Sequence, residues 1–225
     1  MTRSLKYDIP GPDWRVSAED VRAKGWAALF AEGETPIDVS RGLVVDVGFG
    51  RGEFLAELAR RSPDVPHVGI ERAFKRVLKQ ARRLARSELS NVRLLHERAE
   101  VAVEELLEPG SVATFWVNFP DPWPKKRHGR RRLLQPAFVH ALALRLRPGG
   151  RLEVATDDAA YADEIEAALV GEALLESVIP PDARGRRFAP EVPGRIPTAY
   201  ELEWRAEGRP LHFFTFRRIA GTLPA

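Results

Sequence analysis

A glycine-rich stretch, "VVDVGFGRGEF", places Asp46 just before Gly48, Gly50 and Gly52. Glycines at a turn let the backbone approach a ligand closely and adopt conformations that other residues avoid. A dinucleotide-binding fingerprint requires a third glycine at the sixth position of the motif, where this chain has Glu53. The spacing therefore disfavours an NAD site and leaves other nucleotide cofactors open.

A second acid, Glu71, follows Gly50 by 21 residues and ends the stretch "HVGIE". This stretch predicts a buried strand. A carboxylate at the end of such a strand can accept hydrogen bonds from both hydroxyl groups of a ribose. Many nucleoside-binding sites share this acid, so Glu71 indicates a nucleoside without choosing the cofactor. A plainer alternative is that Asp46 and Glu71 only cap the turns after their strands.

The stretch "NFPDPWPKKRHGRRR", residues 118–132, brings an acid and a basic run together. Prolines fix the backbone and remove hydrogen-bond donors, so Asp121 is expected on a stiff turn. Trp123 either packs beneath this turn or stacks on a base. The basic run consists of Lys125, Lys126, Arg127, Arg130, Arg131 and Arg132. Such a run is commonly a solvated face, but beside a reaction site it suits contacts with nucleic-acid phosphates.

Alternating strands and helices must position these residues. Hydrophobic patterning predicts strands at 43–47, 67–71, 92–95, 112–119, 150–156 and 211–218. It predicts helices at 53–61, 73–88, 101–107 and 133–146 and around 161–169, and a long loop at 179–197. The 73–88 helix has an apolar face and a basic face. This alternation indicates an open parallel sheet with helices on both faces, and it places both motifs at the carboxyl edge, where such sheets bind ligands.

Length and composition limit the possible classes of protein. The 225 residues suffice for one sizeable core, and 44% hydrophobic with 30% charged residues is typical of a soluble globular protein. We expect an N-terminal arm at 1–40, with a short helix around 21–30, and a single domain at 41–225. Without cysteine the chain has no disulfide or thiolate metal site, and its five histidines lack metal-ligand spacing, so no metal is expected. No apolar run is long enough to span a bilayer and no secretory signal peptide is evident, which predicts a cytoplasmic protein.

Taken together, the motifs resemble those of a known family. The D-x-G-x-G-x-G pattern resembles motif I of the S-adenosylmethionine-dependent methyltransferases, and "FPDPWPKKRH" is similar to the motif of the bacterial tRNA (guanine-N7-)-methyltransferases. The resemblance covers about residues 43 to 217 and includes "ATDDAAYA" (155–162) and "TAYE" (198–201). It implies a Rossmann-like class I methyltransferase fold, with a mostly parallel seven-stranded sheet whose last strand is antiparallel. It also implies methyl transfer from S-adenosylmethionine to N7 of the guanine at position 46 of tRNA, in the variable loop.

The resemblance implies a role for individual residues. Asp121 would be catalytic. The cofactor site would comprise Asp46, Gly48, Gly50, Gly52, Glu71, Arg98, Ala99 and Asn118. The substrate site would comprise Lys125, Asp157, Thr198, Tyr200 and Glu201, and the basic run would hold tRNA phosphates. The chain departs from the family at Arg98–Ala99, where an Asp or Asn near the adenine usually precedes the alanine. Either a neighbouring glutamate substitutes for this residue, or the Ala99 backbone makes the contact with the adenine.

Other functions remain as alternatives. A methyltransferase acting on a protein side chain or on another RNA base is the nearest, although the basic run and "TAYE" favour nucleic acid. A non-catalytic RNA-binding module on the same fold is disfavoured by the intact Asp46, Glu71 and glycines, and an NAD-dependent dehydrogenase by the glycine spacing. The protein is expected to be a monomer or a homodimer.

Overall fold

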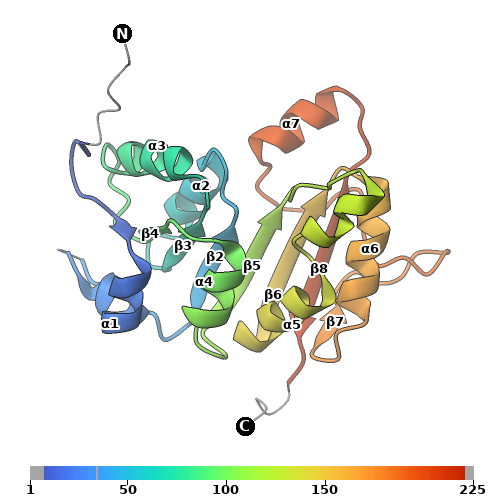
Figure 1. Cartoon of the computed structure of the whole chain (residues 1–225), viewed down its shortest axis with the longest axis horizontal. Coiled ribbons are helices and arrows are strands. Elements are labelled where there is room, and N and C mark those ends of the chain that lie inside the picture. The colour runs from blue at the N-terminus through green and yellow to red at the C-terminus, as the bar shows by residue number, and fades with distance from the viewer. Residues whose placement is uncertain (1–7, 34, 221–225) are drawn as a thin grey trace.

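A single sheet organises residues 8–33 and 35–220, the part of the chain that the computed structural model describes (Figure 1). Its eight strands follow the order β1-β4-β3-β2-β5-β6-β8-β7. They are β1 (Arg15–Val16), β2 (Leu43–Val47), β3 (His67–Ile70), β4 (Val92–Leu95), β5 (Val112–Asn118), β6 (Leu146–Thr156), β7 (Leu175–Ser177) and β8 (His212–Arg218). Neighbours pair in parallel except β8, which is antiparallel to both β6 and β7. The predicted antiparallel end of the sheet is confirmed.

Helices cover both faces of this sheet, as the alternation predicted. They are α1 (Ala18–Ala31), α2 (Glu53–Arg61), α3 (Phe74–Leu84), α4 (Ala99–Glu105), α5 (Pro136–Arg145), α6 (Ala159–Val170) and α7 (Ala199–Ala206), with a 3-10 helix, η1, at Lys126–Arg131. Strand β4 shows the two faces, because its side chains alternate. Val92 and Leu94 pack with the apolar side chains of α2 and α3, whereas Leu95 packs with those of α1, α4 and α5.

Most predicted elements are present, with their ends shifted by a few residues. The sheet has one strand more than the seven expected, because Arg15 and Val16 of the predicted arm pair with β4. Strand β7 and helix α7 were not predicted as elements. The loop expected at 179–197 contains no helix or regular strand and touches the sheet through an isolated bridge between Ala189 and Phe213.

Helix α1 packs firmly onto the sheet. It begins at Ser17, whose side chain accepts a hydrogen bond from the backbone of Asp20, and the two residues form a capping box. Leu29 and Phe30 are buried in the main core, and the Trp26 indole donates to the carbonyl of Leu106 over 2.7 Å. Helical residues cover the predicted span 21–30, but Gly25, with φ of 74° and ψ of 163°, is not helical and kinks α1 within that span. The domain boundary at residue 40 stays a prediction.

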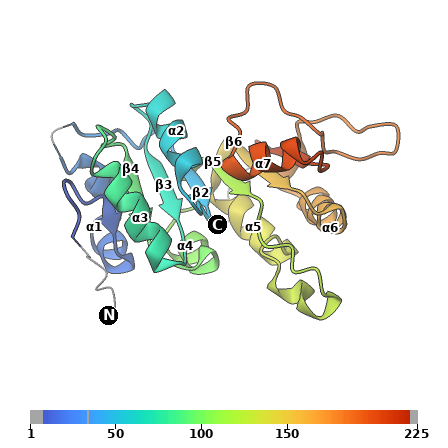
Figure 2. The ribbon, with the colours of Figure 1, turned by 90° about the horizontal axis from the view of Figure 1, so that it is seen from above.

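The chain direction reverses beside β2. From β2 the chain proceeds outward through β3 and β4, then returns to form β5 on the other side of β2. This reversal opens a crevice beyond the carboxyl ends of β2 and β5, which is where open α/β sheets bind ligands. Both views place α3 and α7 on opposite sides of these central strands (Figure 1, Figure 2). In the described part of the chain, every helix is too short or too polar to cross a bilayer.

Candidate active site

The turn after β2 is built from the three predicted glycines. Gly48, Gly50 and Gly52 have φ values of 73°, 57° and 77°, a region that favours glycine. A side chain at Gly52 would also meet Gln80 of α3, since an added Cβ would lie 2.3 Å from its amide. Gln80 is buried and donates to the Gly52 carbonyl over 3.0 Å. The three glycines are therefore required by the conformation and close packing of the turn.

Glu71 fastens this turn to the end of β3. Its carboxylate accepts hydrogen bonds from the backbone N–H of Gly50 at 3.1 Å and of Ala73 at 2.9 Å. Arg76 lies 3.4 Å away on the solvent side. Glu71 therefore holds its position before any ligand arrives, and a carboxylate with about four acceptor sites can still accept from hydroxyl groups.

Asp46 is buried at the end of β2, with 2% of its surface exposed. Burial raises the pKa of its carboxyl to about 7, the Arg195 guanidinium lowers the pKa, and the Glu71 carboxylate raises it again. An acid in this state takes its charge most readily when a cation comes close. This environment fits the predicted contact with a cationic ligand.

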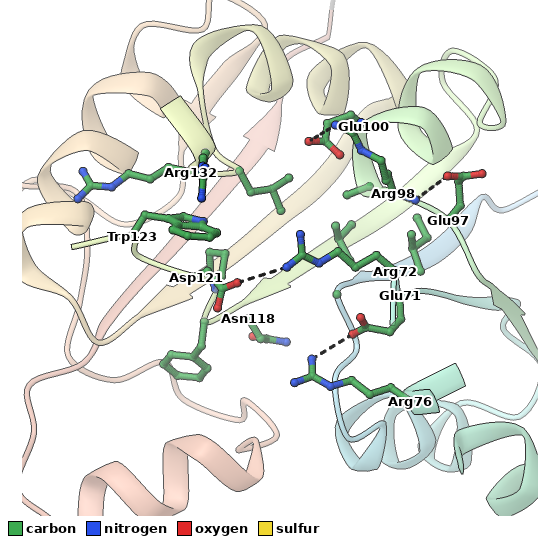
Figure 3. A pocket seen from close by; sticks show the side chains of 18 of the residues that line it. Glu71, Arg72, Arg76, Glu97, Arg98, Glu100, Asn118, Asp121, Trp123 and Arg132 are labelled. Atoms are coloured by element: carbon green, nitrogen blue, oxygen red, sulfur yellow. Dashed lines mark hydrogen bonds and ion pairs between the residues drawn. The ribbon is translucent and has the colours of Figure 1, made fainter. Parts of the chain in front are cut away.

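The turn that follows β5 and carries Asp121 has an uncommon backbone conformation. Phe119 and Trp123 have φ values of 52° and 44°, although neither is glycine. Such conformations cost energy and concentrate at functional sites. Asp121, between them, is exposed and faces Arg72 across the crevice at 4.0 Å (Figure 3). The expected stiff presentation of Asp121 is consistent with this turn.

The basic run divides into exposed and internal members. Lys125, Arg127, Arg130 and Arg131 are exposed, and Arg131 lies 5.0 Å from the Trp123 ring. Arg132 differs from the prediction: it is buried, donates to the Pro122 carbonyl over 2.7 Å and pairs with Glu164. Because its guanidinium is bound to Pro122 and Glu164 inside the protein, Arg132 is not available to a phosphate. The side chain of Lys126 lies outside the described part of the structure.

Two adjoining cavities occupy the crevice. The larger has a volume of about 580 Å³, and its predicted cofactor or catalytic residues are Gly48, Glu71, Arg98, Ala99, Asn118 and Asp121. The smaller, of about 50 Å³, lies beside Asp46, Gly50, Gly52, Thr198 and Tyr200. Gly48, Asn118 and Phe119 line both, so the two are continuous. Lys125, Asp157 and Glu201 line neither cavity.

The family motif "TAYE" proves to be the start of helix α7. Thr198 is its N-cap and accepts a hydrogen bond from the Glu201 backbone over 3.0 Å. The T-x-x-E spacing is a helix-start signal that sequence analysis missed. Tyr200 stacks on Trp204, with ring centroids 5.4 Å apart. The Glu201 carboxylate is buried and already engaged by Arg195 at 3.4 Å and Arg205 at 3.1 Å.

Two arginines that sequence analysis missed connect α7 to the cofactor side. Arg51, inside the glycine-rich turn, pairs with Glu203 at 3.0 Å and lies 4.9 Å from the Tyr200 ring centroid. Arg195 comes from the long loop, has a side chain only 4% exposed, and donates to the Asn118 side-chain oxygen as well as to Glu201. Its guanidinium also lies over the rings of Phe54, Trp116 and Phe213.

The contact with Arg195 sets the orientation of the Asn118 amide. A guanidinium only donates, so Asn118 must turn its oxygen toward Arg195. Its NH₂ group is buried without a partner among the described residues and points to the Glu71 side of the crevice (Figure 3). Asp157, by contrast, stands past the end of β6 and is 3.8 Å from Arg209.

The residues of the crevice fit S-adenosylmethionine. A volume of about 580 Å³ is within the range of small-molecule sites. The buried Asp46 and Glu71 match an ammonium group and ribose hydroxyls, and the unpartnered NH₂ of Asn118 matches an acceptor such as a carboxylate. Beyond β4, Glu97, Arg98, Ala99 and Glu100 all line the larger cavity, so both alternatives for the adenine contact stay open.

Comparison with known sequences identifies relatives over most of the chain. The family model described as "Putative methyltransferase" matches residues 40–214. A tRNA (guanine-N(7)-)-methyltransferase of Streptomyces coelicolor is 35% identical over 211 residues, which cover 92% of this chain and 73% of that protein. One of Thermus thermophilus is 42% identical over 180 residues, 79% of this chain. The matched part spans only 54% of that longer relative.

Comparison with solved structures shows the fold. The antibiotic-resistance methyltransferase Kmr has a TM-score of 0.56 at 22% identity, covering 91% of this chain and 94% of its own. An rRNA methylase from Streptococcus thermophilus has a TM-score of 0.54 at 16% identity, covering 82% and 90%. The predicted Rossmann-like class I methyltransferase fold is confirmed.

Proposed function

The chain belongs to the tRNA (guanine-N7-)-methyltransferase family, and on this premise we propose that it transfers a methyl group from S-adenosylmethionine to N7 of a guanine in tRNA. One observation carries the proposal: an acid-lined cavity and an exposed basic run meet at the same edge of the sheet. The first suits a cationic nucleoside, and the second suits RNA phosphates. The resemblance of "FPDPWPKKRH" supports guanine 46 of the variable loop as the target, and a tRNA substrate fits a cytoplasmic location.

The crevice residues would divide the binding of the cofactor. Glu71 would accept from the ribose hydroxyls, Asp46 would face the ammonium group, and Asn118 would donate to the carboxylate. The backbone at Ala99 and the apolar wall of Val47, Ile70 and Leu133 would hold the adenine. When bound, the cofactor supplies a methyl group made electrophilic by its sulfonium.

Asp121 would act by its charge rather than by taking a proton. Guanine N7 has an exposed lone pair, so it needs no base before it attacks a methyl group. The methylated ring is cationic, and the exposed Asp121 carboxylate would stabilise that developing charge. Alignment of N7 with the methyl group would provide the rest of the acceleration. Arg72, now paired with Asp121, would turn to a tRNA phosphate.

The guanine would be held between the β6 end and α7. Asp157 is the acid best placed to accept from guanine N1–H and the amino group, because it is partly exposed and has only a weak pair with Arg209. Tyr200 lines the smaller cavity, and its ring, stacked on Trp204, would form part of the wall that holds the guanine. Thr198 and Glu201 would act chiefly by holding α7 in place, as their hydrogen bonds indicate. The base must leave its stack to present these edges.

A methyl-transfer assay with product analysis tests this proposal. Purified protein is incubated with isotopically labelled S-adenosylmethionine and unmodified tRNA, and the tRNA is then digested to nucleosides. We expect label in 7-methylguanosine alone, and none from a transcript that lacks the variable-loop guanine. Label in another nucleoside, or transfer only to protein, would replace this function with one of its alternatives.

A further inference from the structure

The outer surface of α3 carries positive charge without the usual compensation. Residues 72–87 contain seven lysines and arginines and no aspartate or glutamate. Solvated helices commonly alternate charges, because like charges four residues apart, such as Lys75 with Lys79 or Lys79 with Arg83, repel each other. The basic side chains of α3 therefore destabilise the helix that carries them. Solubility alone does not explain why so many positive charges lie there without acids.

Five of these side chains gather at one place on the surface. A hollow of about 350 Å³ is lined by Leu78 and by the α3 basic face, which comprises Lys75, Lys79, Arg82, Arg83 and Arg86. Arg83 pairs with Glu53 at 2.9 Å, and Arg82 donates to the Asp8 carbonyl. The other three are exposed, and no carboxylate of the described chain pairs with them.

The α3 basic face continues the rim of the crevice. Helix α3 begins at Phe74, two residues after Arg72, and Arg76 in its first turn lines the larger cavity (Figure 3). From Lys75 to Arg83 the basic positions extend about 12 Å away from the crevice along the helix, and Arg86 follows in the turn after it. On the opposite wall stand Arg130 and Arg131 of η1. A polyanion reaching into the crevice would therefore meet positive charge on both sides.

We propose that the α3 basic face is a second tRNA-binding surface, which contacts phosphates of the tRNA body while the target guanine lies in the crevice. This inference rests on the proposed function. Lys75, Lys79 and Arg86 make contacts that carry no sequence information and position the tRNA. These three residues raise the affinity for tRNA and orient it on the protein. The methyl-transfer step itself depends on other residues.

Binding measurements at several salt concentrations test the proposal. The triple variant Lys75→Gln/Lys79→Gln/Arg86→Gln is compared with Arg41→Gln/Arg60→Gln/Arg147→Gln, which removes the same charge from exposed positions toward the amino edge of the sheet. We expect the first variant to bind unmodified tRNA roughly ten- to a hundredfold more weakly, and its salt slope to fall by about 2 to 3. S-adenosylmethionine affinity stays unchanged in both. Equal tRNA affinity and slope in the two variants would overturn the proposal.

A contact map gives a second, independent test. The chain has no cysteine, so Lys79→Cys creates a unique site for a tethered iron chelate that cleaves nearby RNA. We expect cuts in the backbone of bound tRNA from Lys79→Cys and none from Arg147→Cys. Absence of cuts from Lys79→Cys in a complex shown to contain tRNA would overturn the proposal. Both tests read binding, so a failure of methyl transfer would not be mistaken for a failure of this surface.

Discussion

Arg195 is the residue whose replacement tests the structure of the site most severely. It is nearly fully buried, donates to Asn118 and Glu201, and lowers the pKa of Asp46. The variant Arg195→Met retains an unbranched apolar side chain but removes the guanidinium, and with it the charge, the donors and the contacts with three aromatic rings. Glu201 keeps Arg205 as a partner, so the change acts mainly on Asn118 and Asp46.

The expected loss of stability has a constant part and a part that depends on pH. A lost hydrogen bond between a charged donor and a buried amide costs about 1.5–3 kcal/mol at any pH. Asp46 supplies the other part. Its folded pKa of about 7 lies above its ordinary value of 3.8, so the folded protein keeps a proton that the unfolded chain releases. Stability therefore falls as pH rises from about 4 to 7 and is level above that.

Removal of Arg195 raises the pKa of Asp46 further, which extends this fall above pH 7. Each unit of that rise adds about 1.4 kcal/mol to the destabilisation at high pH. Urea unfolding of both proteins at pH 5.5 and 8.5 measures it. We expect the difference between Arg195→Met and wild type to be larger at pH 8.5, and Asp46→Asn to abolish the increase. The same difference at both pH values would show that Arg195 does not influence the ionisation of Asp46.

Three further substitutions test separate parts of the site. Asp121→Asn should lower kcat roughly a hundredfold with unchanged unfolding and tRNA affinity, and near wild-type turnover would remove its proposed role. Gly52→Ala should destabilise the fold by about 2 kcal/mol in urea unfolding, because the φ of 77° and the contact with Gln80 both oppose it; Gly185→Ala, with φ of 80° and no neighbour, should cost less. Thr198→Ala should cost about 1 kcal/mol by removing the α7 cap and should raise KM for tRNA, whereas Thr198→Ser should restore both.

Sequence patterns predicted the central fold and most of the crevice because both depend on local signals. The runs that form β2, β3 and β4 are buried on both faces, whereas β5 mixes buried and half-buried residues, and the glycines and acids follow at the strand ends. Once the alternation indicates a parallel sheet, the carboxyl ends must lie at one edge. Asp46, Glu71, Asn118 and Asp121 could therefore be brought together from the sequence alone.

The rest of the site depends on contacts distant in sequence. Arg195 lies in a loop rich in proline and glycine and meets Asn118 across 77 positions, which no local pattern records. Arg132 belongs to the same basic run as the exposed arginines before it, so the sequence does not reveal that its side chain is buried against Pro122. Helix α7 carried a recognisable capping signal at Thr198, yet it is short and follows the irregular loop. Strand β1 has only two residues, too few for any periodicity.

Mapping the methylated base shows whether the protein modifies N7 of guanine 46 in tRNA. Unmodified tRNA is incubated with the protein and S-adenosylmethionine, then treated with borohydride and aniline, which break the chain at 7-methylguanosine. We expect a single break in the tRNA at position 46, which requires both the cofactor and the protein. Efficient methylation without a break there, or with breaks elsewhere, would contradict it.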